Sequence, residues 1–291
     1  MGQMFEAVTR IGTWIKSRKN KPGAIPLGLH LEGPYISQNA CGAHPKNALR
    51  AFSLSEIEAL WSASQGTIKI LTIAPEILSS DQLLALSRWS KKHKVVLSLG
   101  HSQATEEQAK TAFDHGFTNM THGWNALSFH HRAPGPIGAA LGRKDVCVEL
   151  ILDQIHVAPT VIRWTCALHG KNICFVSDCV PAAETILGSW HSFGDLKIQL
   201  KDGAGRVESG HLAGGGKLLS HLFAEWIGAE ATRTGEKPLK LLARHQASLN
   251  EIPLKSLGIA PKILKNYLKN YKTRWQIDKE GQIRVMHVIS G

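Results

Sequence analysis

Short apolar, β-branched segments alternate along this chain with segments of helical periodicity. The apolar segments predict strands at 25–31, 68–73, 95–99, 117–121, 146–152 and 173–177. Helical spacing predicts helices at about 81–93 and 159–168, and two more helices begin at the capping-box sequences Ser53–Glu56 and Thr105–Gln108. Strands that alternate with helices in this way are typical of a parallel sheet built from βα units.

The pattern is less regular after residue 181. The glycine-rich segment 188–216 predicts a loop or hairpin excursion, and 218–227 and 238–245 predict helices. Residues 274–289 contain two β-like runs around 279–281, which predict a hairpin, the remnant of a small β domain.

Polar residues at the strand ends distinguish between two parallel folds, an open doubly wound sheet and an eight-stranded barrel. The C-terminal end of a barrel is the face on which its active sites are built. No glycine-rich phosphate-binding loop follows the first strand, which weakens the doubly wound alternative. The sequence therefore favours a (β/α)8-type barrel. The polar residues at or just after predicted strands are Glu32, Glu76, His101, His122, His156 and Asp178.

Three of these residues have the types found at metal sites. A carboxylate such as Glu32, which leaves an apolar strand, is costly to bury unless it is paired or bound to a metal. A helix cap or an ion pair would explain Glu32 alone equally well. His101 and His122 on consecutive strands favour the metal, because neighbouring barrel strands direct such side chains toward one mouth. One glutamate and two histidines suit one zinc-like divalent ion with a position open for water.

The next two strand ends supply the groups that amide hydrolysis needs. A bound metal lowers the pKa of its water from about 15.7 to about 7. Asp178 would carry the proton from that water to the leaving amine, and His156 would hydrogen-bond the carbonyl oxygen as charge develops.

An ordered series of motifs between about residues 27 and 181 resembles the N-acetylglucosamine-6-phosphate deacetylases, which are metal-dependent amidohydrolases. The motifs are HLEGP at 30–34 with GAHP at 42–45, GHS at 100–102, TH-x-x-NA at 121–126, HHR-x-PG at 130–135, D-x-x-H at 153–156 and SD at 177–178. Each motif is short, but their order is specific.

The resemblance implies a role for each matching residue. Glu32, His101 and His122 would bind the metal, and Asp178 would be the acid/base of a reaction that converts N-acetyl-D-glucosamine 6-phosphate into D-glucosamine 6-phosphate and acetate. A guanidinium such as that of Arg132 can hold a phosphate through two parallel hydrogen bonds. The residues implied in binding the amino-sugar phosphate are Ala43, His44, Asn125, Ala126, Arg132, Asp153 and His156, with Leu212, Ala213 and Gly214 in a loop that closes on it.

The resemblance also implies that this chain holds six of the eight barrel strands. We expect residues 1–250 to form the partial barrel and the basic segment 251–291 to form the remnant of a β-sandwich. Two unpaired sheet edges would result, and either a second copy of the chain or its own tail could cover them. Two alternatives stay open: another metal-dependent amidohydrolase, and a truncated, non-catalytic homologue.

Charge and composition add limits on the partners. The formal net charge is +11, and residues 251–291 hold eight Lys and Arg against three Asp and Glu. No zinc-finger spacing or RNA-recognition pattern accompanies this charge, so we expect a solvated basic surface and not a nucleic-acid site. The N-terminal residues do not have the pattern of a secretory signal, and no apolar run reaches the length of a membrane span, so we expect neither feature. Five cysteines without a CxxC pair favour a reducing cytoplasm.

Overall fold

Six parallel strands form the central sheet of the protein. The computed structural model describes residues 2–18, 26–237, 240–241, 271–277 and 283–290. Within the sheet the strands follow one another in chain order, and every neighbouring pair is parallel. The strands are β1 (Leu29–Glu32), β2 (Ile68–Ile73), β3 (Val96–Leu99), β4 (Phe117–Met120), β5 (Cys147–Ile151) and β6 (Ile173–Val176).

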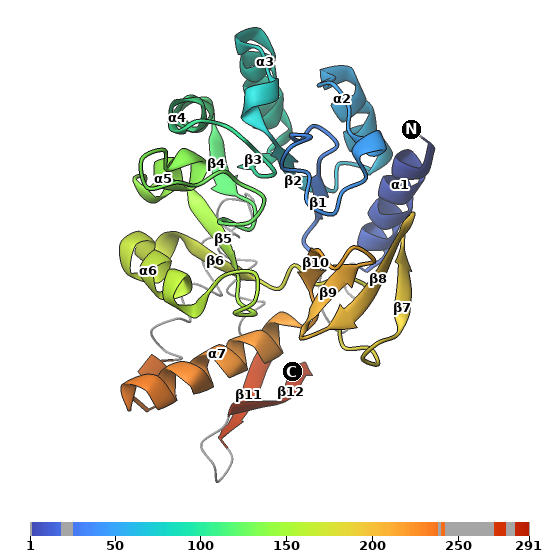
Figure 1. Ribbon diagram of the computed structural model, residues 1–291. Coiled ribbons are helices and arrows are strands. Elements are labelled where there is room, and N and C mark those ends of the chain that lie inside the picture. The colour runs from blue at the N-terminus through green and yellow to red at the C-terminus, as the bar shows by residue number, and fades with distance from the viewer. Residues whose placement is uncertain (1, 19–25, 238–239, 242–270, 278–282, 291) are drawn as a thin grey trace.

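Helices cover the outside of this sheet. Figure 1 shows α2 to α6 as an arc around the curved strands, with α1 beside β1. This arrangement confirms the predicted (β/α)8-type fold and each of the six predicted strands within a few residues. The helices are α1 (Gly2–Ser17), α2 (Leu54–Ala63), α3 (Ser80–His93), α4 (Glu106–Asp114), α5 (Gly135–Leu141) and α6 (Pro159–His169), with 3₁₀ turns η1 (Lys46–Ala48), η2 (Pro75–Ile77) and η3 (Gly170–Asn172).

The helix starts follow from side-chain caps. Thr105 and Gln108 form the predicted capping box of α4. Only half of the box predicted for α2 forms: Ser53 accepts the backbone N–H of Glu56, but the Glu56 carboxylate is taken by the Tyr35 hydroxyl and the Arg50 guanidinium. A buried carboxylate gains more from a cation and a hydroxyl than from one exposed N–H, so tertiary contacts override the local motif.

The hydrophobic core lies between the sheet and the helices. Strand residues such as Leu71, Leu97 and Phe117 are fully buried against helix residues such as Leu86 and Phe113. Both faces of a parallel barrel sheet are covered, which explains why the strands are continuous apolar runs in the sequence.

Residues 188–216 form more regular structure than the predicted loop or hairpin. They make a four-stranded antiparallel sheet in the order β10-β9-β8-β7, from β7 (Trp190–Phe193), β8 (Leu196–Lys201), β9 (Ala204–Val207) and β10 (Leu212–Gly215). The strands are short, and residues in left-handed backbone make the tight turns between them, which is why alternation alone was a weak signal. The last strand returns to the end of β6, where the N–H of Gly215 donates to the Asp178 carbonyl at 2.7 Å.

The remaining described elements are α7 (Leu219–Thr234), which is longer than predicted, and β11 (Tyr271–Ile277) and β12 (Ile283–Ser290). The two strands are antiparallel, as predicted, and β12 lies beside α7 (Figure 1). The turn at 279–281 and most of the helix predicted at 238–245 fall outside the described residues. The division at residue 250 stays a prediction. No described helix is long and apolar enough to cross a membrane.

Truncation of a core side chain on the central strands tests this packing. We expect Leu97→Ala to lower the free energy of unfolding by about 2–5 kcal/mol, because the fully buried side chain leaves a cavity. Leu84→Ala is the matched control: Leu84 is 40% exposed on α3, and its loss changes the stability by about 0.5 kcal/mol or less. Urea denaturation measures both variants, and equal losses would contradict the packing described.

Candidate metal-dependent active site

Glu32, His101 and His122 meet at the C-terminal end of the barrel strands. Glu32 is the last residue of β1, and the two histidines follow the ends of β3 and β4. The Glu32 Oε1 atom lies 3.0 Å from His101 Nε2 and 2.9 Å from His122 Nε2, and the two nitrogens are 3.0 Å apart. Ligand atoms of these three residues all lie within 4.8 Å of one another, a group that could hold a metal ion.

The hydrogen bond behind the His101 ring fits metal binding. His101 Nδ1 lies 2.8 Å from the carbonyl oxygen of Ala40, which can only accept, so Nδ1 carries the proton and Nε2 presents a lone pair. His122 Nε2 faces the same point, and its buried Nδ1 has no hydrogen-bond partner. A tetrahedral site with bonds of about 2.0–2.1 Å has ligand atoms about 3.3 Å apart, close to the triangle seen here. The donor set therefore fits a zinc-like ion.

The backbone at this end of the barrel is held in an uncommon conformation. His101, His122, Ala126 and Asp178 have φ values of 49°, 31°, 51° and 47°, in the left-handed region. Each such non-glycine residue costs of order 1–3 kcal/mol and persists only where the surrounding structure holds it, and such residues cluster at functional sites.

Charges within the cluster shift the pKa values of its members. Burial disfavours the charge of Glu32, but the close contacts of its carboxylate with the His101 and His122 rings hold the pKa of Glu32 well below its usual range. Burial likewise lowers the pKa of His122, but the hydrogen bond and charge of Glu32 outweigh it and raise the pKa to about 9. Burial raises the pKa of Asp178, which holds no such hydrogen bond. The cluster thus stabilises added positive charge, as a cation site must.

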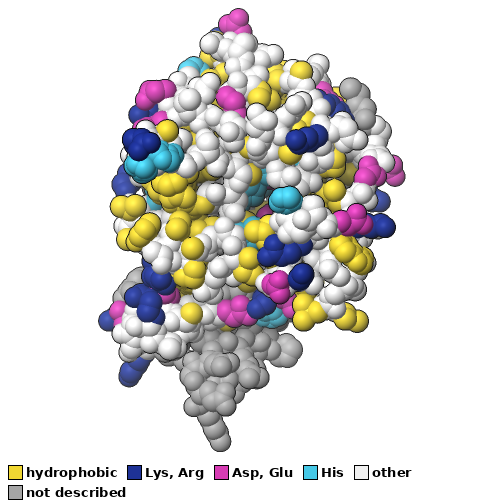
Figure 2. Space-filling model, in the orientation of Figure 1, with side chains coloured by type: hydrophobic (Ala, Val, Ile, Leu, Met, Phe, Trp, Pro, Cys, Tyr) yellow, Lys and Arg dark blue, Asp and Glu magenta, His cyan; other side chains and the backbone are white. Residues whose placement is uncertain are grey.

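A cavity of about 830 Å³ opens above this cluster. In Figure 2, histidine side chains gather in the hollow at the centre of this face. The cavity brings together most of the residues predicted to act on the substrate. Besides the three metal-site residues, those that line it are Ala43, His44, Asn125, Ala126, His156, Asp178, Leu212, Ala213 and Gly214.

Two residues predicted to bind the substrate lie outside the lining of this cavity. Asp153 is buried, and its carboxylate accepts a hydrogen bond from His156 Nδ1 at 2.6 Å and another from the His156 backbone N–H at 2.8 Å, so it orients that ring. Arg132 is exposed, and its guanidinium donates to His131 Nε2 at 3.1 Å.

Glu76 lies in the 3₁₀ turn η2 just after β2 but does not belong to the site. Its carboxylate accepts hydrogen bonds from the Ser102 hydroxyl and the Gln103 backbone N–H, both at 2.6 Å, and so fixes the loop after β3. A position at a strand end therefore identifies candidates, and the direction of the side chain decides among them.

The structure adds lining residues that the sequence analysis did not single out. His30 lies two positions before Glu32 and therefore on the same face of β1, a signal that alternation in the strand could have supplied. The turn between β7 and β8, from Phe193 to Leu196, also reaches the cavity. No sequence signal connects this turn with β1, because the contact is formed between distant elements.

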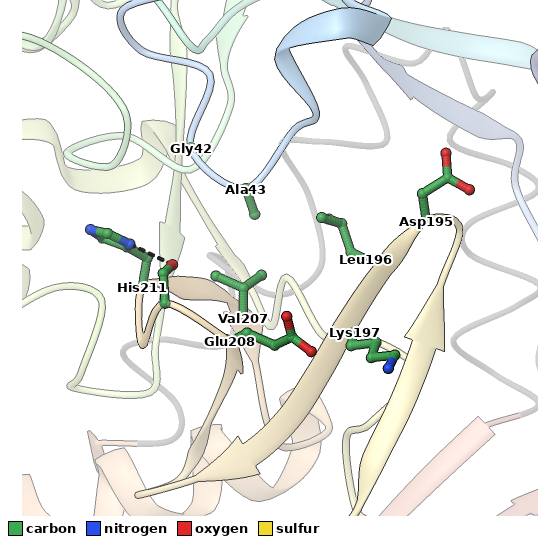
Figure 3. A pocket seen from close by; sticks show the side chains of 9 residues that line it. Gly42, Ala43, Asp195, Leu196, Lys197, Val207, Glu208 and His211 are labelled. Atoms are coloured by element: carbon green, nitrogen blue, oxygen red, sulfur yellow. Dashed lines mark hydrogen bonds between the residues drawn. The ribbon is translucent and has the colours of Figure 1, made fainter.

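A second hollow of about 450 Å³ adjoins the cavity and shares Gly42, Ala43, Asp195 and Leu196 with it. Figure 3 shows Lys197, Glu208 and His211 on the antiparallel sheet around this hollow. None of the metal-site residues lines it, so it forms an outer approach to the cavity.

Comparison with known proteins supplies the relatives of this chain. It is 33% identical over 245 residues to the N-acetylgalactosamine-6-phosphate deacetylase of Escherichia coli O157:H7 and 32% identical over 216 residues to the N-acetylglucosamine-6-phosphate deacetylase of Bacillus subtilis. The two matches cover 84% and 73% of this chain. The chain resembles the N-acetylglucosamine-6-phosphate deacetylases.

Solved deacetylase structures have the same fold. The Thermotoga maritima enzyme superposes with a TM-score of 0.73 at 32% identity, over 88% of this chain and 66% of that one. A Mycobacterium smegmatis variant in complex with N-acetyl-D-glucosamine-6-phosphate superposes with a TM-score of 0.78 at 28% identity, over 88% of this chain and 64% of that one. No family model matches the chain.

The chain is shorter than these deacetylases. It spans 62% of the E. coli relative and 54% of the B. subtilis relative.

Addition of zinc tests the metal site. We expect zinc to raise the midpoint of thermal unfolding of the unchanged chain, because a ligand at 100 times its Kd stabilises the folded state by about 2.7 kcal/mol. His101→Ala should lose this shift. His115→Ala should keep it, because His115 precedes β4 at the other end of the barrel and bonds to the carbonyl of Thr111. Calorimetry with and without a chelator measures the shift, and an equal shift in both variants would contradict the site.

Proposed function

We propose that this chain is a metal-dependent amidohydrolase that hydrolyses N-acetyl-D-glucosamine 6-phosphate to D-glucosamine 6-phosphate and acetate. The observation that carries the proposal is the position of Asp178 and His156 in the same cavity as the Glu32, His101 and His122 cluster. Amide hydrolysis needs an activated water, a polarised carbonyl and a proton for the amine, and this cavity holds a group for each.

Glu32, His101 and His122 would hold one divalent ion, and zinc is the ion that this ligand set suits best. When bound, such an ion lowers the pKa of a water molecule and polarises a carbonyl oxygen. The hydrogen bond from His101 to Ala40 keeps the lone pair of that ring directed at the ion.

Asp178 would act as the general base and then as the general acid. Its carboxylate lines the cavity and takes a proton from the attacking water. Burial raises its pKa, so the protonated carboxyl is easier to form and can pass the proton on to the amine nitrogen.

His156 would donate a hydrogen bond to the carbonyl oxygen as negative charge develops. Its Nδ1 is held by Asp153 at 2.6 Å, which leaves Nε2 for the cavity. In this proposal the Asp153 carboxylate acts through His156 and does not touch the substrate.

The remaining lining residues would bind the amino-sugar phosphate. His44, Asn125 and the backbone of Ala126 supply polar groups at the cavity wall, and Leu212 to Gly214 lie beside Asp178 on β10. Arg132 would hold the phosphate as an ion pair, and binding of the phosphate would draw its side chain away from His131.

The relatives support this substrate class. Their names specify 6-phosphates of N-acetylated glucosamine or galactosamine. We further propose that the chain acts in the cytoplasm, supported by five cysteines that are all free in the structure. An assembly of identical chains stays a prediction.

Replacement of the acid/base tests the chemistry. We expect Asp178→Asn to lower kcat for acetate release by about 10²–10⁴-fold, the contribution of a general acid/base, while zinc binding is retained. Asp195→Asn is the matched control, because Asp195 lines the same cavity from the β7–β8 turn and has no role in the reaction. Coupled acetate detection measures both rates. If the unchanged chain releases no acetate, it is the non-catalytic homologue instead.

The substrate phosphate has a separate test. We expect Arg132→Ala to raise KM for the phosphorylated sugar roughly tenfold or more, since a hydrogen bond to a charged group contributes about 1.5–3 kcal/mol. KM for N-acetylglucosamine without phosphate should stay the same. Lys197→Ala removes a cation outside the cavity lining and serves as the control. Equal KM changes for the two sugars would favour a different amidohydrolase.

A further inference from the structure

A network of hydrogen-bonded polar side chains, buried from Thr72 onward, crosses the barrel among the strands that end at the metal site. His30 on β1 contacts Thr72 on β2 at 2.7 Å, and the Thr72 hydroxyl lies 2.7 Å from that of Thr121. The Thr121 hydroxyl meets Ser98 on β3 at 2.6 Å, and Ser98 accepts a hydrogen bond from Asn119. The hydrogen-bond network ends at Glu149 on β5, where Asn119 Nδ2 donates to Glu149 Oε1 at 2.8 Å.

Glu149 is the acidic residue at the end of this network, and it is only 8% exposed. No ion pair joins its carboxylate to a lysine or arginine in the described part of the protein. Burial of a carboxylate is costly unless hydrogen bonds replace its water. Its second oxygen, Oε2, accepts the backbone N–H of His122 at 3.3 Å.

This contact lies where regular pairing of β4 with β5 stops. The last paired residues are Met120 and Val148, and the next residue on β5 is Glu149. Beyond this point the backbone turns into the left-handed conformation of His122, at φ 31°. The turn is pressed against β5, since a Cβ atom on Gly123 would lie 2.6 Å from Val148 Cγ1.

We propose that Glu149 is a positioning residue that holds the backbone of His122 in its left-handed turn and so aims the His122 ring at the metal. The inference rests on the metal site of the proposed function. A side chain that orients a metal ligand through a hydrogen bond commonly changes metal affinity 10- to 100-fold when it is removed. Here the hydrogen bond goes to the backbone of the metal ligand and not to its ring. The Glu149 carboxylate accepts the His122 N–H in the place where a carbonyl of β5 would accept it if the pairing of β4 with β5 continued.

Three substitutions separate a hydrogen bond from a charge. Glu149→Gln keeps the length and an oxygen acceptor for the His122 N–H, and a rotated Asn119 amide can pair with the new amide. Glu149→Asp keeps the charge but is one methylene too short. Glu149→Ala loses both the oxygen acceptor and the charge. We expect zinc affinity close to that of the unchanged chain for Gln, and about 10- to 100-fold weaker for Asp and Ala.

Ser98→Ala is the matched control. Ser98 is fully buried in the same polar network but forms its hydrogen bonds with Thr121 and Asn119 and not with His122, so we expect its loss to lower stability without a change in zinc affinity. Competition with a chelator on the full chain measures the zinc Kd, and thermal unfolding without metal measures the stability of each variant. Visible absorption with Co²⁺ reports whether the coordination geometry changes in Glu149→Asp but not in Ser98→Ala.

The outcomes are distinct. Wild-type affinity in Glu149→Asp, or an equal loss in Glu149→Gln and Glu149→Ala, would overturn the positioning role. An affinity loss in Ser98→Ala as large as in Glu149→Asp would assign the effect to general stability and overturn it as well. If Glu149→Ala does not fold, the comparison of zinc affinity between Glu149→Gln and Glu149→Asp tests the positioning role. If the unchanged chain binds no zinc, the metal site of the proposed function fails together with this inference.

Discussion

The parallel register of the six-stranded sheet determines where the site residues can lie. Because neighbouring strands run in the same direction, their C-terminal ends lie at one edge, and Glu32, His101 and His122 meet there although up to 90 residues separate them along the chain. The covered faces of the sheet supply the apolar packing that fixes each strand end. Without that packing, three polar side chains that need partners would each be solvated separately.

The site combines a rigid base with a strained rim. Below the cluster, buried threonine, serine and asparagine side chains join neighbouring strands through hydrogen bonds. Above it, His101, His122 and Asp178 occupy left-handed backbone that is costly for residues with a Cβ atom. The hydrogen-bonded threonine and serine hydroxyls stabilise the strands below the site. This stabilisation offsets the free-energy cost of the left-handed residues at the rim.

The antiparallel sheet β7–β10 contributes to the same cavity from outside the barrel. Its last strand bonds to the backbone on both sides of Cys179, through Asp178 and Val180, and a Cβ atom at Gly215 would lie 2.0 Å from the Ser177 carbonyl oxygen. That close approach requires a glycine and fixes the strand beside the proposed acid/base. The cavity is thus shared between two sheets, and its outer wall comes from residues that carry no catalytic motif.

The alternation of strands and helices, the six strand ends and the groups gathered there follow from the order of the amino acids, because apolar periodicity and residue chemistry are local properties. The motifs at those strand ends also carry the resemblance to the deacetylases. Three other features depend on the fold: Glu76 fixes a loop, Asp153 orients His156, and residues 190–215 form a four-stranded sheet. The role of Glu149 likewise depends on a contact between two strands. These features arise from the direction of side chains and from contacts between distant segments, which no local pattern encodes.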